Sequence, residues 1–254
     1  NDTFTTFLKY FGLNSIDDHS NQVVEAESFL LVSKLVINFF KSFNSEIKSD
    51  KEIFLKFINS VYLNGYKKIK SSQLNETMQN TVLASVISLL HRVLIILGKD
   101  SLTLIEYFLL NDFKHFNVEV FESGLKFFAY LTASHKKESK ELVVKSFGLF
   151  FNSVKGMTLP VPKKVMSESE KSIVNLYTQL IKLIQNICLD FVEVFFESEL
   201  RNLNVVDFLV EITENIQDSS TRRFAVKCLK ALLTHLVKFN STEMMMKANQ
   251  LLEF

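Results

Sequence analysis

Basic side chains are the feature of this sequence with the clearest binding chemistry. They gather in short groups, at turns between predicted helices and at the start of one helix. A lysine or arginine that contacts a phosphate releases the counterions held there, so a row of such contacts gives salt-dependent binding to a polyanion. The residues predicted to make these contacts are Lys67, Lys68, Lys70, Lys136, Lys137, Lys140, Lys163, Lys164, Arg222 and Arg223.

The overall charge requires these groups to come together in the fold. The chain has 29 basic and 28 acidic residues and a formal net charge of +1, so a positive surface can arise only by local segregation of charge. Lys155 precedes the group that contains Lys163, and Lys227 and Lys230 continue the group that begins at Arg222. The competing interpretation is that these residues are ordinary solvated surface, which is the commoner role of lysine.

Residues that could catalyse a reaction or hold a metal show no grouping of this kind. The five histidines stand on different predicted helices and turns, without an i, i+4 pair and without a cysteine at metal-ligand spacing. The sequence has neither a glycine-rich phosphate loop nor a nucleophile elbow. Cys188 and Cys228 lie in apolar helical patterns, which predicts buried, reduced thiols. We therefore predict a chain that is not an enzyme, with no catalytic residue, no metal ligand and no cofactor.

The elements that position the basic groups are predicted to be helices. Only two prolines and six glycines occur in 254 residues, too few for the tight turns of a β protein. Apolar residues recur at helical spacing instead. The predicted helices are 23–43, 51–66, 78–98, 102–110, 118–132, 142–154, 168–196, 205–216, 219–237 and 243–252.

Pairing these helices predicts an all-α, HEAT-like α-solenoid. It would contain about five antiparallel hairpins of roughly 40–55 residues, close to the period of about 40–47 residues in HEAT units. We expect one continuous solenoid over residues 1–254, with an interruption at 156–166, where Pro160 and Pro162 fall. A globin-like cluster of helices is the alternative. Because turns on one side of a solenoid line up, the basic groups would form one stripe.

The segment 78–98 is the most apolar long stretch and is predicted to be a central packing helix. It is apolar on more than one face, as a helix packed on both sides must be. His91 and Arg92 interrupt it, and its uncharged run is too short to span a bilayer, so no membrane partner is expected. The chain opens Asn-Asp-Thr, without an initiator Met. We expect it to be a fragment of a longer chain or a concatenation of ordered pieces.

The order of local patterns resembles the C-terminal part of the transfer RNA export receptors, the exportin-T branch of the karyopherin-β family. The resemblance begins at Leu89-Leu90-His91-Arg92 and Leu97-Gly98-Lys99-Asp100, continues through 113–127, and returns in VVDFLVEITENIQD and SSTRRFAVKCLKALLTHLV of 205–237. It covers roughly residues 81–237. The loop 156–165 departs from the family pattern.

This resemblance implies a superhelical arch whose inner surface grips transfer RNA by shape and backbone contacts. It further implies that GTP-bound Ran binds mainly through parts of the receptor outside this chain, that nucleoporins are further candidate partners, and that the receptor shuttles between nucleus and cytoplasm without binding DNA. The basic residues named above come from electrostatics, not from a family motif. The alternative is a HEAT protein–protein scaffold, or a karyopherin with protein cargo and no RNA role.

Overall fold

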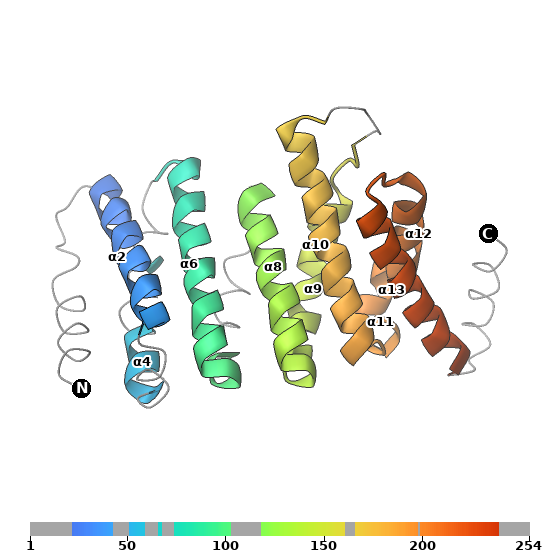
Figure 1. The fold of residues 1–254 in the computed structure, drawn as a ribbon, viewed down its shortest axis with the longest axis horizontal. Helices are drawn as coiled ribbons and strands as arrows, with labels where there is room; N and C mark the ends of the chain where they lie inside the picture. Colours follow the sequence, from blue (N-terminus) through green and yellow to red (C-terminus); the bar gives the residue numbers. More distant parts are fainter. Residues whose placement is uncertain are drawn as a thin grey trace. The chain divides into compact units, whose positions relative to one another are not determined.

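The computed structural model is all-α over the residues that it describes, which confirms the all-α part of the predicted fold class. These residues are 22–42, 51–58, 66–67, 74–102, 118–160, 166–197 and 199–238, and no β-strand occurs among them. The chain divides into two compact units, Asn1–Asp112 and Phe113–Phe254. The interruption expected at 156–166 therefore falls inside the second unit. Figure 1 shows the helices of both units.

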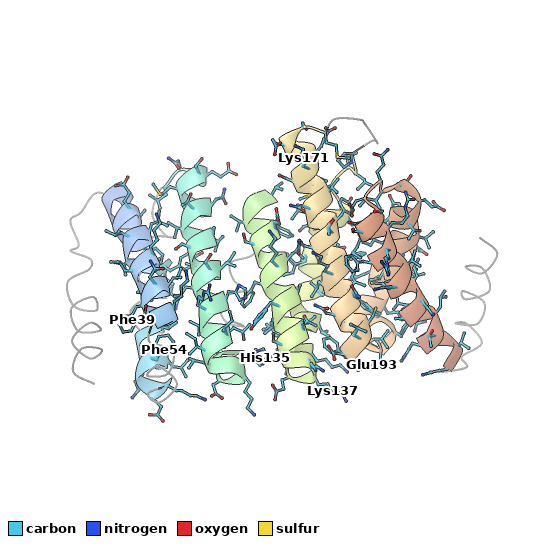
Figure 2. The ribbon with its side chains drawn as sticks, in the orientation of Figure 1. Phe39, Phe54, His135, Lys137, Lys171 and Glu193 are labelled. Carbon is cyan, nitrogen blue, oxygen red and sulfur yellow. The ribbon has the colours of Figure 1, made fainter. Side chains whose placement is uncertain are left out.

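The first unit is built around contacts between two long helices. Phe40 of α2 meets Phe54 of the short helix α4 edge to face, with ring centroids 4.5 Å apart. Both side chains are fully buried. Figure 2 shows Phe39 and Phe54 in this unit. The side chains of Lys51 and Asp100 form an ion pair of 2.8 Å. The described elements are α2 (Gln22–Ser42), α4 (Lys51–Phe57), α6 (Glu76–Leu97) and the 3-10 helix η2 (Gly98–Ser101), with α2 packed on α6.

Helix α6 is the buried helix that the sequence predicts. The side chain of Asn75 caps it by accepting a 2.8 Å hydrogen bond from the Met78 amide, and Gly98 ends it at φ 59°, a conformation that glycine adopts without strain. By length and composition, Glu76–Ser101 could cross a membrane, but 56% of its most apolar window is buried in the protein. A helix covered in this way is typical of a core.

The second unit arranges its long helices in two layers. Helices α8, α10 and α13 lie side by side, and α9 and α12 lie behind them (Figure 1). Helix α10 packs against α8, α9 and α13, so it is the central element of the unit. The described elements are α8 (Val118–His135), η3 (Lys136–Ser139), α9 (Lys140–Lys155), α10 (Glu168–Asp190), α11 (Val194–Glu197), η4 (Glu199–Leu203), α12 (Val205–Asn215) and α13 (Ser219–Lys238).

Phenylalanine rings fill the core of the second unit between the two layers. Phe150 of α9 packs edge to face on Phe121 and Phe128 of α8, with centroid separations of 5.2 and 4.7 Å. Phe151, one residue on, meets Phe208 of α12 at 4.9 Å. Edge-to-face geometry places a positive ring edge against a negative ring face, which adds to the gain from burial. These three ring contacts join α9 to both α8 and α12.

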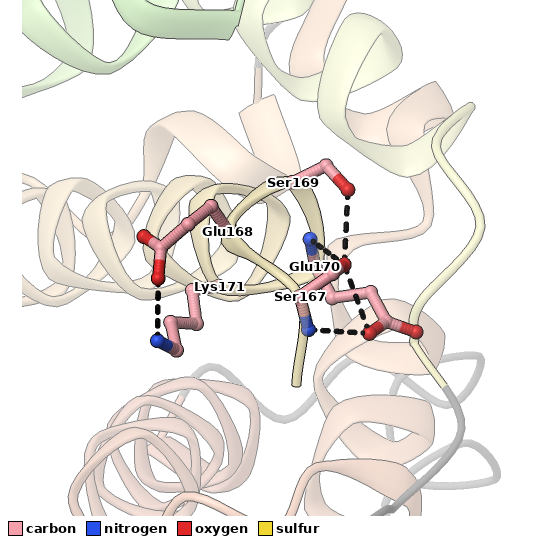
Figure 3. A network of polar contacts seen from close by, with 5 residues as sticks. All are labelled: Ser167, Glu168, Ser169, Glu170 and Lys171. Atoms are coloured by element: carbon pink, nitrogen blue, oxygen red, sulfur yellow. Dashed lines mark hydrogen bonds and ion pairs between the residues drawn. The ribbon is translucent and has the colours of Figure 1, made fainter. Parts of the chain in front are cut away.

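Helix α10 begins where the sequence predicts and ends earlier. Its capping box is formed: the Glu170 amide donates to Ser167 Oγ at 3.3 Å and the Ser167 amide donates to Glu170 Oε2 at 2.9 Å (Figure 3). The predicted end near Phe196 is wrong, because α10 stops at Asp190 and Phe191 adopts φ −159°. Phe191 is buried, and the change of direction lets Phe195 be buried too.

The other predicted bounds agree with the structure to within a few residues where it describes them. Predicted helix 51–66 is described as α4 up to Phe57, and residues 59–65 lie outside the described ranges. Of predicted helix 102–110 only Leu102 is described, and all of 243–252 lies outside the described residues.

Replacing Phe150 by Ala should destabilise the second unit by about 3–5 kcal/mol, because it removes a fully buried ring and leaves a cavity. The neighbouring Leu149, whose side chain is 36% exposed, provides the matched control, and Leu149→Ala should cost less than about 1 kcal/mol. The measurement is the free energy of unfolding in urea. Equal losses for the two variants would contradict the proposed position of the aromatic core.

Candidate functional site

Helix α13 presents cations on its exposed side and contains no Asp or Glu. Residues three and four apart share a face of a helix, so Arg223, Lys227 and Lys230 form one row. All three are exposed, and the opposite side of the helix, which includes Cys228 and Leu232, is fully buried. The side chains of Arg223 and Lys230 form no hydrogen bond or ion pair with another described residue. The row Arg223–Lys227–Lys230 is called the α13 basic face.

The beginning of α13 is fixed by a polar cluster. Asp218 Oδ2 accepts hydrogen bonds of 2.6 Å from the amide and from the hydroxyl of Thr221. These bonds hold the pKa of Asp218 below its ordinary value. Thr221 Oγ1 also lies 2.8 Å from Thr178 Oγ1 of α10. Arg222 donates to the carbonyl oxygen of Ile216 at 2.6 Å, which engages part of its guanidinium in the turn.

The second basic group in this unit is largely paired with carboxylates. Lys140 Nζ lies 2.7 Å from Glu193 Oε1, and Lys136 Nζ lies 4.0 Å from Asp190 Oδ1. Lys137 is exposed and makes no ion pair with a described residue. Figure 2 shows Lys137 and Glu193 near the same end of the unit, away from Lys171 at the start of α10. The turn 136–140 therefore carries less uncompensated positive charge than its sequence indicates.

The structure does not bring the two described groups of the second unit into one cluster. Thr221, beside Arg222 and Arg223, contacts Thr178, whereas Lys136 lies at Asp190. About 18 Å of helix axis separate these two levels of α10. Of the remaining predicted residues, Lys67 is exposed in the first unit, and Lys68, Lys70, Lys163 and Lys164 lie outside the described residues. For these undescribed lysines, membership of one basic stripe stays a prediction.

The sequence did not indicate a pocket beside the loop that follows α9. Residues 156–160, called the strap, lie over α10 and α12 and border a pocket of about 680 Å³. Tyr177 of α10 donates a 2.6 Å hydrogen bond to the carbonyl oxygen of Met157 and so holds the strap. The ring of Tyr177 stacks on Phe208 at 5.9 Å and 11°. The proline at the end of the strap predicted a loop, but no local signal predicts its contact with Tyr177.

Among the described residues that line this pocket, two are acidic and one is basic. Glu211 and Glu214 of α12 line it, and Lys155 lies at another edge, with its ammonium 5.7 Å from the centre of the Phe151 ring. Burial, followed by the charge of Glu211, raises the pKa of the Tyr177 hydroxyl. Tyr177 is therefore a hydrogen-bond donor to the strap and not a proton-transfer group at neutral pH.

The titratable groups of the described residues offer little chemistry. No group of three or more His, Cys, Asp or Glu side chains there is placed to hold a metal ion. Cys188 and Cys228 are both buried, as predicted. The hydrogen bond with Cys228, followed by burial, raises the pKa of the Cys188 thiol, and a protonated thiol is a poor nucleophile. Burial, followed by the charge of Arg92, lowers the pKa of His91.

Comparison of the chain with protein-family models, with curated proteins and with solved structures gives no match.

The Lys140–Glu193 pair should make stability fall in acid. Burial raises the pKa of Glu193, but the hydrogen bond and charge of Lys140, a backbone hydrogen bond and the charge of His235 together hold it below the ordinary 4.5. The folded chain therefore binds fewer protons than the unfolded chain just below pH 4.5, and the contribution of the pair is lost as the pH falls through that window.

Glu193→Gln should lower the free energy of unfolding by roughly 0.5–1 kcal/mol at pH 7, because the pair is only partly exposed. The difference from the unmodified chain should shrink at pH 3. Urea titrations at both values measure it. Glu214→Gln, at an exposed position without an ion pair among the described residues, serves as the control. A Glu193→Gln deficit that stays constant with pH would contradict this assignment.

Tyr177→Phe should loosen the strap without disturbing the core, because it removes only the hydroxyl that holds Met157. The expected loss of global stability is about 0.5–1.5 kcal/mol. Hydrogen exchange should show faster amide exchange at residues 157–159 but unchanged exchange in the middle of α10. Uniformly faster exchange throughout the unit would instead indicate that the ring itself had lost its packing.

Proposed function

We propose that this chain is part of a transfer RNA export receptor and contacts the RNA through phosphates. The observation that carries the proposal is the α13 basic face, an exposed row of cations on a helix that has no carboxylate. The resemblance of 81–237 to the karyopherin-β export receptors supplies the identity of the polyanion. The same resemblance supports GTP-bound Ran as a partner of other parts of the receptor, nucleoporins as further partners, and shuttling between nucleus and cytoplasm.

The α13 basic face suits a nucleic acid that is recognised through its own sugar-phosphate backbone. Arg223 and Lys230 are separated by about 10 Å along the helix, so they can reach different phosphates of one RNA. Side chains cannot read the deep major groove of A-form RNA, and contacts to phosphates and to the overall shape remain available. Among the described cations predicted to contact RNA, Arg223 and Lys137 make no ion pair with a described residue, whereas Lys136 and Lys140 already face carboxylates.

The finer architecture that we propose is a HEAT-like solenoid. Helices α8 and α9 are joined by η3, and α12 and α13 by a turn of three residues, so each pair has the form of a helical hairpin. The side-by-side packing of α8, α10 and α13 supports stacking of such hairpins.

A protein-binding role is the second candidate function, and α12 favours it. Asp207, Glu211 and Glu214 are exposed on this helix, which has no basic residue. Carboxylates repel phosphates but attract basic segments of proteins. A HEAT scaffold or a karyopherin with protein cargo would use this surface.

Charge reversal on the α13 basic face should weaken RNA binding selectively. Arg223→Glu combined with Lys230→Glu should lower the affinity for transfer RNA by roughly 10- to 100-fold and reduce the slope of log K against log salt by about two. Fluorescence anisotropy at a series of salt concentrations measures both quantities. The control is Lys126→Glu combined with Lys145→Glu, which makes the same change in net charge at two lysines that are paired with Glu122 and Glu141.

Equal losses of RNA affinity in the two double variants would contradict a specific role for α13. Absence of salt-dependent RNA binding in the full-length receptor, with and without GTP-loaded Ran, would contradict the export proposal as a whole.

A further inference from the structure

Helix α13 has a row of apolar residues next to the α13 basic face. The members of the row are three or four residues apart and so share one side of the helix: Val226, Leu229, Leu233 and Val237. Val226 and Val237 are 52% and 61% exposed, and Leu229 and Leu233 are half-buried. These four residues are called the α13 apolar row. Exposed apolar residues in a continuous row, unlike singly scattered ones, indicate a surface that packs against another element.

The contacts between α13 and its described neighbours use another side of the helix. Its buried residues are Thr221, Ala225, Cys228, Leu232 and Leu236. The Cys228 thiol lies 3.8 Å from the carbonyl oxygen of Ile181 in α10, and Thr221 contacts the same helix. Helix α12 also packs on α13. Because Val226 and Val237 stay more than half exposed, they lie outside the surface that α10 and α12 bury.

The sequence that follows α13 contains a segment with matching apolar positions. Residues 243–252 are predicted to be a helix and lie outside the described residues. Met244, Ala248, Leu251 and Leu252 recur at i, i+4, i+7 and i+8, which is the spacing of one helix face. The other positions are polar except for Met246, and they include Glu243, Lys247, Asn249 and Gln250. Such a helix is expected to bury one side and to leave the other in water.

The length of the connection determines how this segment can meet the α13 apolar row. Only the four residues 239–242 separate the end of α13 at Lys238 from the predicted helix, which is typical of an antiparallel helical hairpin. Residues equally distant from the middle of such a connection lie opposite each other. This register pairs Met244 with Val237, Ala248 with Leu233, and Leu252 with Leu229. The apolar side of the segment thus meets the row at three successive levels.

We infer that residues 243–252 form a helix that docks on the α13 apolar row and covers it. The short connection holds the segment at a local concentration on the order of millimolar, so it outcompetes a second copy of the chain at micromolar concentration. Arg223 and Lys227 lie on the adjoining side of α13 and stay accessible to a polyanion. The inference does not rest on the RNA-binding proposal, and each can fail alone.

The first test introduces two cysteines into the full chain. Leu233→Cys combined with Ala248→Cys places two thiols at facing positions of the hairpin. With glutathione disulfide as oxidant, these thiols should form an intramolecular disulfide while two molecules of glutathione are released. Bridging should be roughly tenfold faster than in the control, Thr234→Cys combined with Ala248→Cys, because a disulfide requires Cα atoms about 4.4–6.8 Å apart. Thr234 is exposed on the side of the basic face. Non-reducing electrophoresis and peptide mapping identify the bridged thiols.

Hydrogen exchange provides a second test, without new thiols. Met244→Ser combined with Leu252→Ser should speed amide exchange at residues 244–252 by roughly tenfold and leave the middle of α10 unchanged. The matched control is Asn249→Ser combined with Gln250→Ser, on the polar side of the segment, which should change exchange by less than about threefold. Both variants introduce two serines, so a general loss of helix propensity would affect them alike.

Equal bridging rates of the two cysteine pairs, or equal exchange in the two serine variants, would overturn the inference. A disulfide that joins two copies of the chain would also overturn it, because the α13 apolar row would then be an interface between copies. Circular dichroism spectra check that each variant is folded.

Discussion

Burial of α10 among α8, α9 and α13 is the interaction on which the second unit depends. Leu180, Ile184 and Ile187 of α10 have no exposed surface, so this helix cannot shift without opening contacts on more than one side. Interiors packed in this way are rigid. A rigid α10 therefore fixes the positions of the residues that contact it along its length. Tyr177 on α10 holds the strap, and Asp190 at its end lies beside Lys136.

Features with local causes could be predicted from the sequence. The capping box of Ser167 and Glu170 involves residues three apart, and apolar spacing along a helix needs no tertiary information. The end of α10 could not be predicted in the same way. The apolar residues after Asp190 continue a helical period, but burial of Phe191 and Phe195 outweighs local helix propensity and turns the chain.

The candidate sites show the same division between local and distant causes. Residue types alone identified the cations of α13, and the structure shows Arg223 exposed as expected. Residue types could not show that Lys140 would meet Glu193, because this pair joins elements far apart in the sequence. The strap pocket was missed for the same reason, since Tyr177 and Met157 are brought together only by the packing of α9 and α10.

Opposite charges on two adjacent helices divide the surface of the second unit. Helix α12 has acidic residues and no basic ones, α13 has basic residues and no acidic ones, and the two pack together. Exposed charges on the two helices are screened at physiological salt, so their attraction adds little stability. The electrostatic potential near α12 is therefore negative, and the potential near α13 is positive. A polyanion approaching α13 and a basic segment approaching α12 would each meet an attractive surface, and both could be bound at once.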